Sequence, residues 1–109
     1  MADEAEWNIL AGVDALSAEY PVSASVAGDD VLIFRVGDGF RGVQSLCPHD
    51  NRPLATARIV GDGKMIRCSY HNYTFKLDSG KGVNCPGFRV KVFEVKAEQN
   101  TLFARPIAP

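Results

Sequence analysis

The sequence lacks the features that mark secreted, membrane-spanning or nucleic-acid-binding proteins. No apolar run approaches the roughly 18 residues of a membrane span. The first ten residues, MADEAEWNIL, have neither the basic start nor the apolar segment of a signal peptide. Three widely spaced cysteines do not make a disulfide framework, and scattered basic residues with a formal net charge of −1 do not indicate nucleic-acid binding. We therefore expect a cytoplasmic protein without a membrane or nucleic-acid partner.

Helical periodicity is also missing, because no stretch keeps an apolar repeat over three turns. Short apolar or alternating segments, separated by turns rich in Gly, Asp and Asn, predict an antiparallel β-sandwich or barrel instead. The length of 109 residues predicts one domain, residues 1–109. Strands are expected at residues 7–13, 22–26, 31–36, 40–46, 57–60, 64–68, 73–77, 89–97 and 101–105.

Histidine is scarce, and its placement is informative. Both histidines of the chain, and two of its three cysteines, lie between residues 47 and 71. They form two short boxes, Cys47-Pro48-His49 and Cys68-Ser69-Tyr70-His71. Each box supplies one thiolate and one imidazole, and both groups are common metal ligands. The sequence therefore predicts a metal site built from Cys47, His49, Cys68 and His71.

Three kinds of site could use these four side chains. A structural zinc ion is one, although such sites usually pair like ligands within each box. A Cys–His nucleophile is another, but it leaves the second Cys and the second His unexplained. A two-iron cluster suits the mixed boxes better, because both thiolates can bind one iron and both imidazoles the other.

The pattern C-x-H followed by C-x-x-H resembles the ligand signature of Rieske [2Fe–2S] proteins. The resemblance covers nearly the whole chain. Its supporting positions are Leu54, Phe75, Gly80 and Pro86. It implies an all-β fold, a Rieske-like antiparallel β-sandwich with a small cluster-binding hairpin subdomain, about 46–81, inserted at one end. It also implies one cluster per chain, with Cys47 and Cys68 on the inner iron and His49 and His71 on the outer iron.

Some positions depart from the family pattern. The family often has glycine at the places of Asn51 and Asn72, and asparagine is the other residue that best tolerates a left-handed conformation. We therefore expect tight loops at both places.

Rieske proteins of respiratory complexes carry a disulfide at the places of Arg52 and Tyr70, and hydroxyl donors to the cluster at those of Tyr73 and Phe75. Without these donors the reduced cluster is less stabilised, so the resemblance implies a soluble protein with a potential of roughly −150 mV.

The resemblance implies an electron carrier and not an enzyme. The expected function is that of a ferredoxin in a bacterial multicomponent dioxygenase system of aromatic hydrocarbon catabolism. Its partners would be a flavin-containing, NADH-dependent ferredoxin reductase and a terminal oxygenase, docking near His49 and His71. The alternative is the small Rieske subunit of an NADH-dependent nitrite reductase, and a structural zinc module is a third hypothesis.

Charge is unevenly distributed along the chain. Residues 47–81 carry six basic and three acidic side chains, whereas the remainder is acidic in balance. Either this is scatter over a solvated surface, or the metal-binding end docks on an acidic partner. The third cysteine, Cys85, has no histidine near it in sequence and is expected to be a free thiol beside the cluster.

Overall fold

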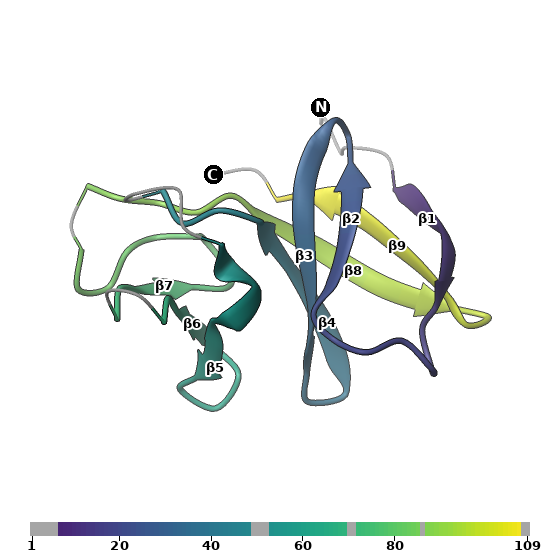
Figure 1. The fold of residues 1–109 in the computed structure, drawn as a ribbon, viewed down its shortest axis with the longest axis horizontal. Helices are drawn as coiled ribbons and strands as arrows, with labels where there is room; N and C mark the ends of the chain where they lie inside the picture. Colours follow the sequence, from purple (N-terminus) through teal and green to yellow (C-terminus); the bar gives the residue numbers. More distant parts are fainter. Residues whose placement is uncertain (1–6, 49–52, 70–71, 86, 108–109) are drawn as a thin grey trace.

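The fold is all-β and consists of a large sheet and a small one (Figure 1). The computed structural model describes residues 7–48, 53–69, 72–85 and 87–107. Within them, the strands are β1 Asn8–Asp14, β2 Val22–Val26, β3 Asp29–Val36, β4 Gly39–Gln44, β5 Arg58–Val60, β6 Met65–Arg67, β7 Thr74–Lys76, β8 Val92–Glu98 and β9 Thr101–Pro106. The one helical element of these ranges is the 3-10 turn η1, Leu54–Thr56, and no helix in them has the length and apolar character needed to cross a membrane.

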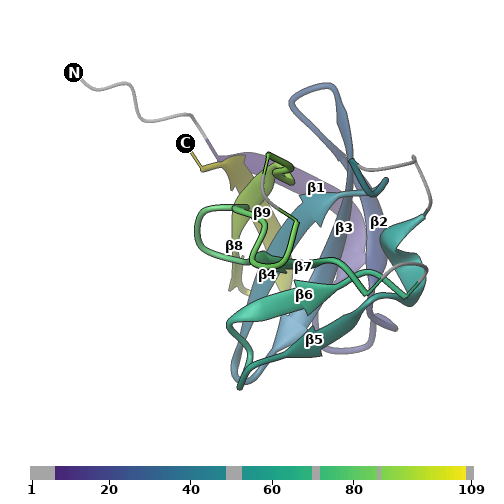
Figure 2. The ribbon, with the colours of Figure 1, turned by 90° about the vertical axis from the view of Figure 1, so that its left-hand side faces the viewer.

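The large sheet has the strand order β1-β9-β8-β4-β3-β2, with every neighbouring pair antiparallel. Its outermost strands, β1 and β2, contact each other, so the sheet curls until it is nearly closed. The small sheet has the order β5-β6-β7 and stands in front of the large one in Figure 2. This arrangement confirms the predicted sandwich with a hairpin unit at one end.

Two hairpins of the large sheet turn through pairs of left-handed residues. The β2–β3 turn is Ala27–Gly28, with φ values of 52° and 87°, and the β8–β9 turn is Gln99–Asn100, with φ values of 52° and 64°. Two positive φ values in a two-residue loop give a twist that matches the flanking strands. The strand expected at residues 31–36 starts two residues earlier than predicted, because β3 already begins at Asp29.

One hydrophobic core lies inside the curl of the large sheet. We call it the sheet core, and it comprises Leu10, Ala15, Val26, Val31, Ile33, Phe93, Leu102 and Ala104. A second core, the intersheet core, joins the large sheet to the small one. It comprises Leu32, Phe34, Val43, Cys47, Leu54, Ile66, Cys68, Phe75, Leu77, Cys85, Val90 and Val92. The molecule therefore has two cores that share the large sheet as a wall.

The double burial explains two features of the sequence. Strand β3 reads as a continuous apolar run because Val31 and Ile33 face the sheet core while Leu32 and Phe34 face the intersheet core. The alternation of apolar and polar residues is interrupted in β8 for the same reason, since Val92 is buried on one face of the sheet and Phe93 on the other.

The tryptophan at the start of β1 lies at the edge of the large sheet. Its ring is flanked by two cations, with Lys96 Nζ 4.4 Å and the Arg105 guanidinium carbon 4.3 Å from the ring centroid. Such contacts favour a fixed ring position. Trp7 therefore ties the first strand to β8 and β9.

Candidate metal centre

The two boxes begin where two strands end. Cys47 follows β4 and Cys68 follows β6, and both side chains are fully buried in the intersheet core. The structure thus brings the two predicted thiol ligands into one core. The predicted ligands His49 and His71 lie outside the described residues, and so do Asn51, Arg52, Tyr70 and Pro86.

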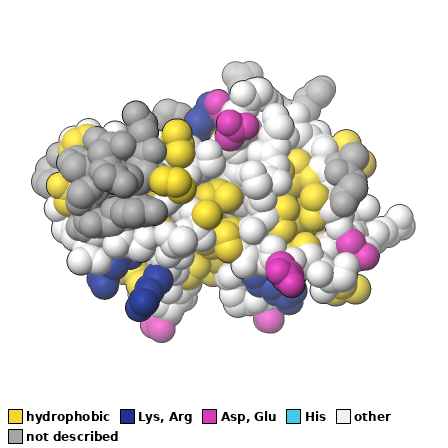
Figure 3. All heavy atoms as spheres, viewed as in Figure 1, with side chains coloured by type: hydrophobic (Ala, Val, Ile, Leu, Met, Phe, Trp, Pro, Cys, Tyr) yellow, Lys and Arg dark blue, Asp and Glu magenta, His cyan; other side chains and the backbone are white. Residues whose placement is uncertain are grey.

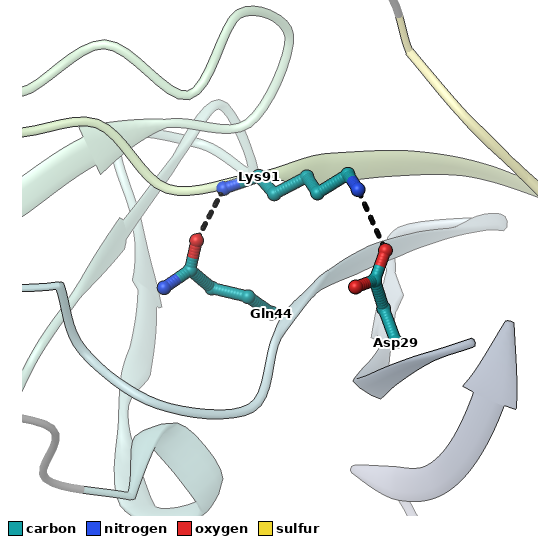
Figure 4. A network of polar contacts seen from close by, with 3 residues as sticks. All are labelled: Asp29, Gln44 and Lys91. Carbon is teal, nitrogen blue, oxygen red and sulfur yellow. Dashed lines mark hydrogen bonds and ion pairs between the residues drawn. The ribbon is translucent and has the colours of Figure 1, made fainter. Parts of the chain in front are cut away.

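A polar network fixes the chain just before Cys47 (Figure 4). The backbone N–H of Lys91 donates to Gln44 Oε1 over 2.7 Å, and Lys91 Nζ binds Asp29 Oδ2 over 2.6 Å. Gln44 Nε2 in turn donates to the Leu46 carbonyl over 2.6 Å. The Gln44 side chain therefore links Lys91, which directly precedes β8, to the segment that leads to Cys47.

The first loop is closed at its base. Leu46 forms an antiparallel bridge with Pro53, and the N–H of Leu54 donates to the Ser45 carbonyl over 2.9 Å. Leu54 then starts η1 and is fully buried in the intersheet core. The sequence did not predict η1, because three residues are too few to show a period.

The second loop is closed by two backbone hydrogen bonds. The N–H of Cys68 donates to the Tyr73 carbonyl over 2.8 Å, and the N–H of Asn72 donates to the Cys68 carbonyl over 2.9 Å. Asn72 has a φ of 58°, so the expected left-handed asparagine is confirmed there. Ser69 Oγ lies 2.7 Å from Thr56 Oγ1, which connects this loop to η1.

A third segment covers the second loop. Asn84 Oδ1 accepts from the N–H of Thr74 over 2.9 Å, and Asn84 Nδ2 donates to the Asn72 carbonyl over 3.1 Å. Cys85 follows, with Sγ 3.9 Å from the Thr74 carbonyl oxygen, and burial raises the pKa of this thiol. Sequence reasoning placed no strand between residues 77 and 89 and missed the role of Asn84. The one signal for that role is an asparagine within a Gly- and Pro-containing loop.

Two glycines allow the third segment to approach. A Cβ on Gly82 would lie 2.6 Å from the Cys85 carbonyl oxygen and 2.8 Å from its Sγ. Gly80 has a φ of 80°, and its position leaves no room for a Cβ against the Val90 carbonyl. Glycine at residue 80 is one of the supporting positions of the resemblance, and close backbone packing explains why this residue type stands there.

The donor set fits an iron–sulfur cluster. Two buried thiols come from two separately closed loops, and soft thiolate ligands select Fe–S clusters, copper or zinc. Phe75, which is fully buried in the same core, has no hydroxyl, and the Tyr73 ring stacks on Phe88 at 6.2 Å between centroids. Among the described residues, which include neither histidine, no three His, Cys, Asp or Glu side chains gather.

The chain matches a known protein family over most of its length. A family model, described as the Rieske [2Fe–2S] domain, matches residues 6–94. The ferredoxin component of the alkene monooxygenase system of Xanthobacter autotrophicus is 26% identical over 96 residues, covering 88% of this chain and 78% of that protein. Some other curated relatives are oxygenase subunits, namely those of carnitine monooxygenase and phthalate 4,5-dioxygenase, and the chain spans 18% of their length or less.

Solved structures share the fold. The ferredoxin of carbazole 1,9a-dioxygenase from Nocardioides aromaticivorans IC177 has a TM-score of 0.72 at 23% identity, covering 93% of this chain and 98% of that one. A Mycobacterium tuberculosis protein, described as an NADH-dependent nitrite reductase small subunit, has a TM-score of 0.77 at 20% identity, covering 98% and 100%.

Proposed function

Because this chain belongs to the Rieske [2Fe–2S] domain family, we propose that it carries single electrons and that Cys47, His49, Cys68 and His71 hold its cluster. The observation that supports this assignment is the burial of Cys47 and Cys68 in one core, each at the base of a closed loop. When bound, a Rieske-type [2Fe–2S] cluster takes up and releases one electron at a time.

The residues of this chain position the ligands and exclude water. Cys47 and Cys68 are both 0% exposed. Gln44 and Asn84 hold the segments on either side, through hydrogen bonds to backbone groups of Leu46, Thr74 and Asn72. Ligands held this way need little rearrangement when the charge of the site changes, which favours rapid electron transfer.

A ferredoxin of an oxygenase system is the function that the relatives support best. The alkene monooxygenase relative is named as such a component, and it aligns with 88% of this chain. The partners would be a flavin-containing NADH reductase and a terminal oxygenase, acting in the cytoplasm on an aromatic or related substrate. Their docking site would lie near His49 and His71.

Exposed apolar side chains support docking at this end of the molecule. Leu46 is 42% exposed, Val83 51% and Phe88 36%, and they flank the first box and form the covering segment. Figure 3 shows hydrophobic side chains on the surface of the part of the molecule that carries the small sheet. Apolar contacts between partners shorten the path for an electron while excluding water.

The second candidate is the small subunit of an NADH-dependent nitrite reductase. It is favoured by the nitrite reductase neighbour, whose fold matches over nearly the full length of both chains. The structural zinc module is no longer needed, because the family match accounts for the mixed Cys and His boxes.

Two measurements test the proposal. The purified protein should be brown and contain about two irons and two acid-labile sulfides per chain. A colourless protein with one zinc would overturn the carrier function. Reconstitution with a flavin NADH reductase should then sustain turnover by a terminal oxygenase, whereas turnover only with a nitrite reductase large subunit would select the alternative.

A further inference from the structure

Two arginines face each other on the small sheet. Arg58 in β5 is the direct cross-strand partner of Arg67 in β6. Like charges directly opposite each other destabilise a strand pair, and an anion bound between them would offset the repulsion. No acidic side chain of the described residues forms an ion pair with either arginine. The pair therefore has the charge arrangement of an anion site.

The pair lines a hollow beside the second loop. The hollow has a volume of about 240 Å³ and is lined by Arg58, Arg67, Ser69 and Asn72. Ser69 and Asn72 belong to the loop that begins at Cys68, so the hollow adjoins the proposed metal centre. Both arginines are exposed and can be reached from solvent.

Hydrogen bonds already hold this hollow in shape. Arg67 Nε donates to Thr74 Oγ1 over 3.3 Å, which leaves the outer guanidinium nitrogens free for a further acceptor. Ser69 is bound to Thr56, and Asn72 is fixed by its bond to the Cys68 carbonyl. A preorganised guanidinium loses little side-chain entropy when it binds an anion.

We propose that Arg58 and Arg67 form a recognition site for a surface carboxylate of the electron-transfer partner, which docks beside the Cys68 loop. This inference rests on the proposed function for the kind of partner. Carboxylates match the planar fork of arginine in a bidentate manner. The occupant is an Asp or Glu side chain on an acidic protein surface.

The surroundings of the pair suit a protein partner. By strand alternation, Val60 and Met65 share the face of Arg58 and Arg67, and Lys76 in β7 is the partner of Met65. This face carries basic and apolar side chains and, among its described strand positions, no acid. Arginine and methionine are enriched at protein interfaces. Figure 3 shows basic side chains, with an acidic side chain below them, along the lower edge of the part of the molecule that carries the small sheet.

The first test measures binding without electron transfer. A dye-labelled hexaglutamate peptide is titrated with the cluster-loaded protein, and fluorescence anisotropy is followed at about 20 mM and about 200 mM salt. Arg58→Gln and Arg67→Gln should each weaken binding about three- to fivefold at low salt. The difference should shrink at high salt, because screening weakens exposed charge pairs.

Two further variants separate a built site from general attraction. Arg35→Gln, in β3 of the large sheet, removes the same charge and should leave the affinity within about 1.5-fold of the parent protein. Arg67→Lys keeps the charge but loses the fork, so it should bind more weakly than the parent. Equal losses in all three glutamine variants, or full affinity in Arg67→Lys, would overturn the site.

The second test asks whether the site adjoins the point of electron exit. The reduced protein is oxidised by hexacyanoferrate(III), an anion that accepts one electron, and by hexaammineruthenium(III), a cation that does the same. Arg58→Gln and Arg67→Gln should slow the first reaction and leave the second unchanged or faster. If hexaglutamate binding falls but neither rate changes, the site does not serve electron transfer and the proposal is wrong.

The two proposals fail in different ways. A chain that contains no iron or does not exchange electrons contradicts the carrier function. A chain that is brown and reducible but binds hexaglutamate equally well with and without Arg58 and Arg67 contradicts only the carboxylate site.

Discussion

At the scale of single residues, burial does not distinguish the three cysteines. Cys47, Cys68 and Cys85 all lie in the intersheet core, and all are free of disulfides. Their backbone settings differ. Cys47 and Cys68 each stand at the start of a loop whose base is held by hydrogen bonds, whereas Cys85 lies in the segment that covers the second loop. The assignment of ligands therefore depends on the loop and on the histidine that follows in sequence.

Substitution of each cysteine tests this assignment. Cys47→Ala and Cys68→Ala should abolish the visible absorption of the cluster, because each removes a thiolate ligand. Cys85→Ala is the matched control, which should keep about two irons per chain and lose about 1 kcal/mol of stability from the small cavity. Iron content and absorption spectra decide the outcome, and loss of iron in Cys85→Ala would make that cysteine a ligand or a required neighbour.

The reduction potential is the second prediction at this scale. Phe75 offers no hydroxyl, and the ring of Tyr73 is stacked on Phe88. Without a hydroxyl donor at residue 75, the more negative, reduced form of the cluster would be less stable. We expect a midpoint potential of roughly −150 mV in a spectroscopic redox titration. A value well above zero would contradict the low-potential assignment.

At the scale of elements, the hairpins depend on residues with positive φ. Ala27 is unusual among them, because its φ of 52° places an alanine where Gly or Asn is favoured. Its neighbour Gly28, with a φ of 87°, has the residue type that this backbone requires. One turn therefore holds an unfavourable residue beside a favourable one.

Opposite effects are expected from changes at these two positions. Ala27→Asn should raise the free energy of unfolding by about 0.5–1 kcal/mol, since asparagine tolerates the left-handed region better. Gly28→Ala should lower it by about 1 kcal/mol, although open space surrounds the position. Thermal unfolding of the two cluster-loaded variants gives the comparison, and a shift of the same sign in both would contradict the explanation.

Sequence reasoning succeeded where a pattern spans several residues. The β-sandwich and most strands followed from alternation and turn residues, and the left-handed Asn72 followed from the resemblance to a family that often has glycine at that place. It failed where tertiary contacts decide, as in the 3-10 turn at Leu54 and the bridging side chain of Asn84. The last strand was expected to end at residue 105, but it includes Pro106, which pairs with Phe93, because a proline needs no ladder donor at a strand end. Ligation by Cys47, His49, Cys68 and His71 stays a prediction.

At the scale of the whole molecule, we expect the two cores to differ in their dependence on the metal. The intersheet core contains Cys47 and Cys68, whereas the sheet core contains neither. Metal binding contributes to the stability of the segments that supply the ligands. We therefore expect the small sheet to open at a lower free energy than the large one.

Iron removal should destabilise the small sheet more than the large sheet. After chelation, hydrogen exchange measured by mass spectrometry should rise in residues 58–76 while β8 and β9 stay protected. Reloading with iron and sulfide should restore the slow exchange and serves as the control. A uniform rise over the whole chain would show that the protein unfolds as a single unit.

The fluorescence of Trp7 offers a way to follow the large sheet separately from the small one. Trp7 is the one tryptophan of the chain and lies beside β8 and β9, at the edge of the large sheet. Its fluorescence emission would therefore report the state of the large sheet, while visible absorption reports the small one. The chain thus carries two intrinsic signals, one for each part of the fold, and needs no added label to tell them apart.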